Sequence, residues 1–287
     1  MENTLYTIQN ETTRAVIARY GAELYSLTDL RSGREQIWQR DPAVWTGCAP
    51  WLFPFIGKLR EGRYLHDGTA YTPAMHGFAK RSYFDAVEQT SDTLHLCLTE
   101  SAETLAVWPW HFALHITYRL EDARLLIDVR LENTDTRTMF FSFGAHPGFV
   151  CADGDRLVFE TPERMTVHRL TADTHLLQPA QPDETDTAGL VLEPALFEND
   201  AMILEAPASR SVTLVRADGS GVVYSFPQVP WLGIWSRYGE RLHYVCVEPW
   251  FGVDDPVDAD GLIEHKTGIQ ILPAGEEFRA EYSIGII

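Results

Sequence analysis

Two ionisable side chains lie in short segments where proline, glycine and aromatic residues interrupt an otherwise strand-like chain. His146 lies in FGAHPGF (143–149), and Glu248 lies in VEPWFG (247–252). Because proline fixes φ and removes a backbone donor, we expect a strand to end or bulge beside His146, whose imidazole is then held by rigid backbone. Glu248 follows the apolar stretch 244–247, so we expect it at the end of a buried strand, where desolvation raises its pKa and makes it a better base. An imidazole and a carboxylate placed in this way can perform general acid–base chemistry.

A third segment combines aromatic and basic residues. It runs over 51–60 (WLFPFIGKLR) and continues at 75–81 (MHGFAKR). In the second segment, Trp250 offers a flat apolar ring face, which is a common platform for the C–H side of a sugar ring. The polar side chains that the third segment adds as binding candidates are His76, Lys58, Arg60, Lys80 and Arg81.

Each of these residues also has a structural interpretation. A lone histidine in a β protein is usually a satisfied structural residue, Glu-Pro-Trp alone is a weak motif, and the basic residues could simply solvate a loop. The chain has no C-x-x-C pair and no Asp-rich calcium loop, so the sequence predicts no metal site. It also lacks a G-x-S-x-G elbow, a P-loop and a dinucleotide fingerprint, and we expect no cofactor.

Period-two alternation of apolar and polar residues dominates the elements that must position these groups. It predicts strands at 94–98, 112–120 and 125–131, and further strands at 15–19, 211–215, 222–226 and 244–247. No long segment keeps the apolar period of an amphipathic helix, and turn residues separate the short strands. We therefore expect an all-β protein, a large antiparallel β-sandwich, formed by a single domain over residues 1–287. The segment 171–189 is predicted to be a long loop within that domain.

The charge balance excludes several classes of partner. The formal net charge is −18, from 41 acidic and 23 basic residues. Such a surface repels nucleic acid and anionic membranes, so we expect a small neutral or weakly charged ligand. The start of the chain has no signal-peptide pattern, and no apolar run reaches membrane-spanning length. Four scattered cysteines are typical of reduced thiols, which favours a cytoplasmic protein.

Taken together, the motifs resemble those of the aldose 1-epimerase (galactose mutarotase) family, in its bacterial branch. The chain reads APWLFPFIG at 49–57, HGFA at 76–79, HPGF at 146–149 and EPWFG at 248–252, in the order of the family. The similarity continues to LPAG at 272–275 and so covers nearly the whole chain. It implies a large β-sandwich with a sugar bound in a cleft on one concave face.

The resemblance also implies roles for single residues. Glu248 matches the general base that takes the proton from the C1 hydroxyl, and His146 matches the acid that protonates the ring oxygen. His76 matches a second histidine that binds the sugar, and Asp200 is the candidate for an acidic residue between the two catalytic positions. The family also uses a basic residue early in the chain, often an arginine directly after HGFA. This chain has Lys80 there, so the candidates for that contact are Lys58, Arg60, Lys80 and Arg81.

Three hypotheses about function remain open at this point. The first is a mutarotase that interconverts the α and β anomers of a free aldose. The second is a hexose-phosphate mutarotase, in which the basic residues bind phosphate. The third is a carbohydrate-binding module without turnover. Arginine is the better bidentate phosphate ligand, so the lysine at position 80 favours a free sugar. The presence of both His146 and Glu248 argues against the third.

Overall fold

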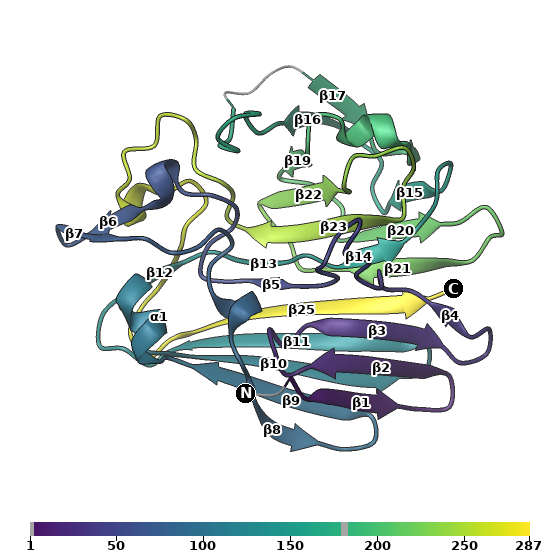
Figure 1. The fold of residues 1–287 in the computed structure, drawn as a ribbon, viewed down its shortest axis with the longest axis horizontal. Helices are drawn as coiled ribbons and strands as arrows, with labels where there is room; N and C mark the ends of the chain where they lie inside the picture. Colours follow the sequence, from purple (N-terminus) through teal and green to yellow (C-terminus); the bar gives the residue numbers. More distant parts are fainter. Residues whose placement is uncertain (1–2, 179–182) are drawn as a thin grey trace.

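The structure is a computed structural model that describes residues 3–178 and 183–287. Nearly all of its regular elements are β-strands (Figure 1). The largest sheet has nine strands in the order β18-β15-β20-β21-β25-β11-β10-β9-β8. Its strands are β8 (Asp85–Gln89), β9 (Thr93–Thr99), β10 (Phe112–Glu121), β11 (Arg124–Asn133), β15 (Arg156–Phe159), β18 (Leu190–Val191), β20 (Ser211–Val215), β21 (Gly221–Ser225) and β25 (Glu277–Ile286).

A second large sheet carries most of the motifs singled out above. Seven of its eight strands run in the order β17-β16-β19-β22-β23-β13-β5, and the eighth, β14, pairs with β23. The strands are β5 (Trp51–Leu52), β13 (Phe143–Ala145), β14 (Gly148–Val150), β16 (Arg164–His168), β17 (Asp183–Asp186), β19 (Met202–Glu205), β22 (Trp231–Trp235) and β23 (Tyr244–Phe251).

Smaller elements complete the fold. A four-stranded sheet consists of β1 (Leu5–Gln9), β2 (Thr13–Ala18), β3 (Leu24–Asp29) and β4 (Arg34–Glu35). Two two-stranded sheets are formed by β6 (Tyr64–His66) with β7 (Thr69–Tyr71), and by β12 (Met139–Phe141) with β24 (Gln270–Leu272). The helices are α1 (Ala102–Val107), η1 (Arg60–Gly62), η2 (Ala79–Arg81), η3 (Pro194–Phe197) and η4 (Ile263–His265). No helix in the described part of the chain is long and apolar enough to cross a membrane.

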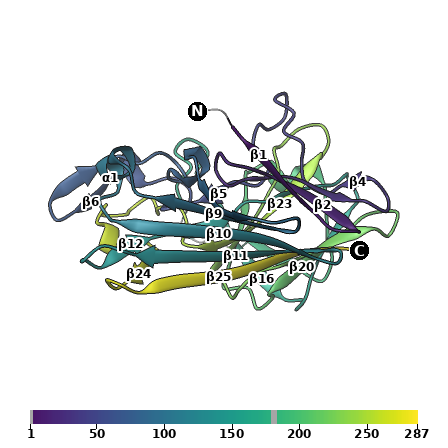
Figure 2. The same ribbon diagram turned by 90° about the horizontal axis from the view of Figure 1, so that it is seen from below.

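The sheets pack face to face because each long strand has one apolar side. In β10, buried and half-buried residues alternate from Phe112 to Leu120, as period-two patterning requires. β1 contacts β9 and β10, and Ile8 of β1 joins the same core as Leu96 and Leu114. Figures 1 and 2 show the four-stranded sheet lying beside β9 and β10, while α1, β6 and β12 gather at the opposite end. The predicted all-β antiparallel sandwich is confirmed.

All seven strands predicted from alternation are present, with bounds that differ by one or two residues in most of them. Two predictions were wrong. Glu248 does not end its strand, because β23 continues through Pro249 to Phe251. The segment 171–189 is not a loop throughout, because β17 lies within it and pairs with β16. Residues 179–182 of that segment lie outside the described residues.

Candidate active site

The strand register brings the two predicted acid–base residues face to face. On one side of a gap in the ladder, Gly144 of β13 pairs with Trp250 of β23. On the other side, Gly148 of β14 pairs with Cys246 of the same strand. The register is the same on both sides, so positions 146 and 248 lie opposite each other. Directly opposed residues on one face of an antiparallel pair have Cβ atoms about 4.5–5.5 Å apart, which is contact range for their side chains.

Two prolines explain the gap. β13 ends at Ala145, directly before His146 and Pro147, as the sequence predicts. The amide of Val247 donates to the carbonyl of Pro147. In a strand the N–H groups of residues two apart point to the same side, so the missing N–H of Pro249 faces this gap. Pro249 is tolerated within β23 because the ladder is already open beside it.

The His146–Glu248 pair is buried yet incompletely bonded. His146 Nε2 lies 3.1 Å from Glu248 Oε2, and the two side chains are 11% and 2% exposed. Neither Glu248 Oε2 nor His146 Nδ1 has a hydrogen-bond partner of good geometry within the described residues. Buried polar atoms are normally bonded, and an exception marks a place where a ligand can supply the missing partner.

Burial shifts the pKa values of the two groups in opposite directions. Desolvation raises the pKa of Glu248 well above its ordinary value, and the negative charges of Asp200 and Asp254 raise it further. Desolvation lowers the pKa of His146 to about 3, which the nearby ammonium of Lys80 also favours. A neighbouring carboxylate favours the charged form of an imidazole, but the loss of solvent is the larger effect on His146. Both shifts favour the neutral form of each residue, with the proton on Glu248 and not on His146, and the two groups titrate as a coupled pair.

His76 is held in one orientation and one tautomer. The amide of Gly57 donates to His76 Nδ1 at 3.0 Å, and the amide of His76 donates to the carbonyl of Gly57. Because Nδ1 accepts, the ring proton is on Nε2, which is therefore a fixed donor. Burial, with nearby Lys80, lowers the pKa of His76 well below its ordinary value, so the ring is neutral. The adjacent Gly77 has a φ of 69°, and a Cβ there would overlap the carbonyl of Phe53.

Asp254 joins the site from the segment that follows β23. Its Oδ1 accepts from the amide of Lys58 at 2.7 Å, and a Cβ at Gly57 would overlap its carboxylate. This close approach explains the glycine at the end of the motif at 49–57. Burial raises the pKa of Asp254 to about 6, against the hydrogen bond from Lys58. A second carboxylate thus acts on Glu248, and no ion pair of Asp254 is found in the part of the chain that the structure describes.

Most of the predicted site residues line one cleft with a volume of about 630 Å³, within the range of small-molecule sites. Arg60 is the exception, because its guanidinium donates to the carbonyl of Ala259 and it is not part of the lining. The predicted residues that line the cleft are Lys58, His76, Lys80, Arg81, His146, Asp200, Glu248 and Trp250.

Asp200 and the basic residues come from separate loops. Asp200, between η3 and β19, has its Oδ2 3.1 Å from His175 Nδ1, and both residues line the cleft. Lys58 reaches across the cleft to the carbonyl of Thr174 at 3.3 Å. Lys80 lies at η2, where burial and the neighbouring Arg81 lower its pKa to about 8. The cleft therefore holds charges of both signs.

The aromatic surface of the cleft differs from the sequence prediction. Trp250 lines the cleft but is only 3% exposed, and a Cβ at Gly233 would come within 2.7 Å of its ring. Half-buried Trp45 and Trp235 flank His146 instead, with ring centroids 5.2 and 5.6 Å from the imidazole. These two rings offer more apolar surface to a ligand than Trp250 does.

One further side chain lies beside the acid–base pair. Donor atoms of His146, Cys246 and Glu248 all lie within 4.8 Å of one another. Cys246 is fully buried and is a free thiol. It is two residues before Glu248 on β23, so the two side chains are on the same face. These three residues could hold a metal ion, and nothing in the spacing of the sequence signals this.

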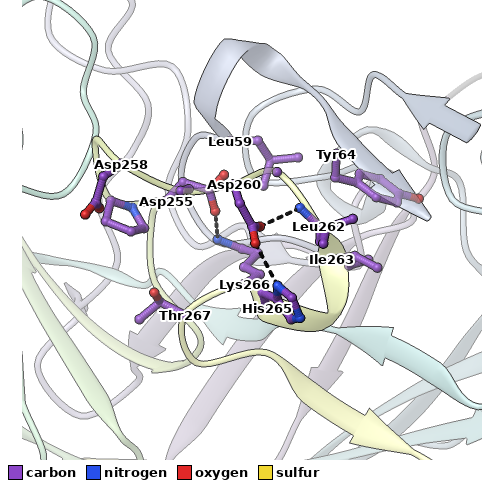
Figure 3. A pocket seen from close by; sticks show the side chains of 13 residues that line it. Leu59, Tyr64, Asp255, Asp258, Asp260, Leu262, Ile263, His265, Lys266 and Thr267 are labelled. Atoms are coloured by element: carbon purple, nitrogen blue, oxygen red, sulfur yellow. Dashed lines mark hydrogen bonds and ion pairs between the residues drawn. The ribbon is translucent and has the colours of Figure 1, made fainter. Parts of the chain in front are cut away.

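Asp255, which follows Asp254 in the chain, and Lys266 line a second cavity of about 250 Å³ (Figure 3). Its central contact is a buried ion pair in which Lys266 Nζ is 2.7 Å from Asp255 Oδ1, with side chains 3% and 5% exposed. Lys266 also donates to the carbonyl of Val253, and Asp255 Oδ2 accepts from the amide of Arg60. This well-bonded pair anchors the backbone on either side of Asp254.

Sequence reasoning missed several residues of the cleft. Asp254 follows the EPWFG motif by two residues, so its place in a turn after the motif was a usable signal. Glu23, Trp45 and Trp235 also line the cleft. They come from other segments of the chain and have no motif of their own. Glu23 is buried and accepts hydrogen bonds from the amides of Cys48 and Ala49.

Comparisons with known proteins agree with this fold and its motifs. The sequence model of the aldose 1-epimerase family matches residues 4–285. The chromosomal form of protein LacX from Lactococcus lactis subsp. lactis is 29% identical over 297 residues, which is 98% of each chain.

Two solved structures are similar over nearly the whole chain. A galactose mutarotase related enzyme from Lactobacillus acidophilus is 30% identical with a TM-score of 0.91, over 99% of this chain and 97% of that one. A galactose mutarotase-like protein from Lactobacillus casei is 26% identical with the same TM-score of 0.91, over 99% of this chain and 100% of that one. This chain therefore belongs to the aldose 1-epimerase family of isomerases and has the galactose mutarotase-like fold.

Proposed function

We propose that the protein interconverts the α and β anomers of a free aldose, with Glu248 as general base and His146 as general acid. The observation that carries the proposal is the buried contact of 3.1 Å between their side chains, in a cleft sized for a small ligand. Both residues line that cleft, and both keep a polar atom without a hydrogen-bond partner among the described residues.

The chemistry needs no cofactor. Glu248 takes the proton of the C1 hydroxyl, the C1–O5 bond breaks as a carbonyl forms at C1, and His146 gives its proton to O5. Rotation about C1–C2 presents the other face of the aldehyde. Reclosure returns the proton from O5 to His146 and from Glu248 to O1. Each positioned proton transfer contributes about a hundredfold to ten-thousandfold in rate.

A pair that holds one proton suits both halves of this cycle. Before ring opening, the proton is on His146 and Glu248 is ionised. After ring opening, it is on Glu248 and His146 is neutral, which is the state that burial favours in the free cleft. Because burial penalises the charged form of either residue, ring opening takes the pair from its charged state to its neutral one.

The other groups in the cleft suit a polyhydroxylated ligand. His76 offers a fixed Nε2–H donor, and Asp200 and Asp254 offer acceptors. Trp45 and Trp235, beside His146, offer apolar ring surface for the C–H groups of the sugar. We propose aldohexoses as substrates, a class that includes the galactose named for several relatives.

A hexose phosphate is a second candidate, because Lys58, Lys80 and Arg81 all line the cleft. Opposing it, Glu23, Asp200, Glu248 and Asp254 line the same cleft and would repel a phosphate. The unbonded acid–base pair argues against the third hypothesis, a binding module without turnover.

We also propose that residues 1–287 form a single cytoplasmic domain whose partner is a small sugar. One buried core contains residues from Ile8 to Ile286, which supports the single domain. The four cysteines are free thiols, which supports a reducing compartment. The net charge of −18 supports a neutral ligand over nucleic acid or a membrane surface.

The test is an NMR anomer-exchange measurement over a panel of aldoses and their 6-phosphates. We expect the wild type to accelerate exchange of at least one free aldohexose and Glu248→Gln to lose that activity while it keeps its fold and sugar binding. Exchange that persists in Glu248→Gln would overturn the proposal. Acceleration confined to the phosphates would favour the second candidate.

A further inference from the structure

The register of β23 places the buried thiol of Cys246 beside His146 and Glu248, which line the cleft. Cys246 and Glu248 are two residues apart on the same face, and His146 lies opposite Glu248 across the ladder gap. Their donor atoms lie within 4.8 Å of one another. Thiolate, imidazole and carboxylate are the three ligand types that bind Zn²⁺ in proteins, and three protein ligands leave a fourth position open.

The bonding of these groups also points to a missing partner. Cys246 is fully buried, and no hydrogen bond of its thiol is found in the described residues. Glu248 Oε2 and His146 Nδ1 are buried without a hydrogen-bond partner of good geometry there. The pair can be reached from solvent, because His146 and Glu248 line the cleft.

The surrounding charges favour a cation at this point. The negative charges of Asp200 and Asp254 act on Glu248, and both residues line the cleft. Lys80 and Arg81 oppose them, but four carboxylates line the cleft against three basic side chains. A divalent ion would neutralise the buried carboxylate, whose charge is costly where it stands.

We propose that His146, Cys246 and Glu248 form a binding site for a thiophilic divalent cation of the Zn²⁺ type, and that its occupation inhibits the enzyme. The ion coordinates the Cys246 sulfur, a ring nitrogen of His146 and a carboxylate oxygen of Glu248. Water or a sugar hydroxyl takes the fourth position. The thiol proton, and the proton shared by the acid–base pair, leave to solvent when the metal binds. Inhibition follows because both reacting groups then hold the metal; this part of the inference rests on the proposed function.

The three donor atoms must move slightly closer together to bind a metal ion. Bond lengths of about 2.3 Å to sulfur and 2.0–2.2 Å to nitrogen or oxygen place tetrahedral ligand atoms about 3.3–3.7 Å apart. The three donors already lie within 4.8 Å of one another, with His146 and Glu248 3.1 Å apart in one pairing of atoms.

The experiment titrates the full chain with ZnCl₂ by calorimetry, in buffers of different ionisation enthalpy. We expect one Zn²⁺ per chain at this site, proton release on binding, and a loss of affinity in Cys246→Ser larger than the roughly 10–100-fold that an outer contact costs. Cys151→Ser is the matched control, because Cys151 is another buried free thiol outside the group, and it should bind like the wild type. Equal Zn²⁺ affinity in Cys246→Ser and wild type would overturn the site.

A second measurement guards against a variant that fails to fold. Co²⁺ added to the wild type should give the charge-transfer absorption of a cobalt–thiolate bond, and its absence would overturn the site directly. Anomer exchange by the wild type should fall with Zn²⁺ and recover with a chelator, whereas Cys246→Ser should keep its activity in Zn²⁺. Thiolate absorption without any anomer exchange would leave the site standing and reject the proposed function instead.

Discussion

Two buried pairs of ionisable residues lie close together in this protein and are built in opposite ways. In the Asp255–Lys266 pair, the charges are in contact at 2.7 Å, and further backbone groups bond to both side chains. In the His146–Glu248 pair, one polar atom of each side chain lacks a hydrogen-bond partner among the described residues, and burial opposes ionisation of both groups. The first pair is satisfied and holds backbone in place; the second is left unsatisfied, and its missing partners are those that a sugar can supply.

The difference suggests how the site is kept reactive. The satisfied pair flanks Asp254 and fixes it against Gly57 and Lys58. Rigid support of this kind holds the neighbouring acid–base groups in place although His146 Nδ1 and Glu248 Oε2 have no hydrogen-bond partner among the described residues. Substitutions in the two pairs should therefore separate activity from stability.

The largest expected effect is on activity, at the unsatisfied pair. Replacing His146 by Asn removes the general acid, so kcat for anomer exchange should fall by about 10²–10⁴-fold. The free energy of unfolding should change less, because His146 Nδ1 has no hydrogen-bond partner to lose among the described residues. Polarimetry and urea denaturation measure the two quantities. A variant that retains near wild-type kcat would exclude His146 as the acid.

Substitution in the Asp255–Lys266 pair should lower the free energy of unfolding. Lys266→Met leaves the carboxylate of Asp255 buried without its partner, which costs about 3–5 kcal/mol in the free energy of unfolding. Urea denaturation should show this loss. The double variant Asp255→Asn/Lys266→Met should recover part of it, since no uncompensated charge remains. A loss below about 1 kcal/mol in Lys266→Met would mean that the pair is not a structural anchor.

Asp254 lies between the two pairs, and its ionised carboxylate should lower the free energy of unfolding in a pH-dependent way. Its pKa is raised to about 6 from an ordinary 3.8, so the folded state binds a proton that the unfolded state has lost between these values. Stability therefore falls as the pH rises from about 4 to 6, and the cost is complete above 6. Asp254→Asn should stabilise the protein by at most about 2–3 kcal/mol at pH 7.5 and by little at pH 4. Denaturation curves at the two pH values test this, and an equal effect at both would contradict it.

The smallest expected effect concerns the aromatic surface. Trp45→Ala should raise the KM for the sugar about 3- to 10-fold with a lesser change in kcat, because stacking contributes about 0.5–1.5 kcal/mol. Trp45→Phe should restore much of the loss. Trp250 is only 3% exposed. Trp250→Phe should therefore lower the free energy of unfolding and leave KM for the sugar nearly unchanged. Steady-state kinetics of the three variants decide which ring contacts the sugar.

The sequence predicted the fold well because its strands are amphipathic. In β10 and β11 the side-chain period matches the burial period over ten residues, so alternation alone identified them. β23 was cut short because its proline normally ends a strand; only the pairing partner shows that the ladder is open beside Pro249. Strands such as β17, which are short and polar, have no apolar period to detect.

For the site, the sequence identified residues that lie in recognisable motifs and missed those that do not. His76, His146 and Glu248 lie in motifs and line one cleft. Trp45, Glu23 and Trp235 reach the cleft through the packing of separate segments, which no local pattern encodes. The position of Arg60 also depends on packing, because its side chain turns toward Ala259. The pKa of His146 could not be inferred either, since it depends on how completely the rings around it exclude water.

The central claim is that His146 and Glu248 act as one unit that shares a proton, and a double-mutant cycle tests it most directly. Anomer-exchange rates would be measured for the wild type, His146→Asn, Glu248→Gln and the double variant. Groups that work as a unit show strongly non-additive losses, so the double variant should be about as slow as the slower single variant. Losses that multiply in the double variant would show that the two residues act independently and would contradict the account.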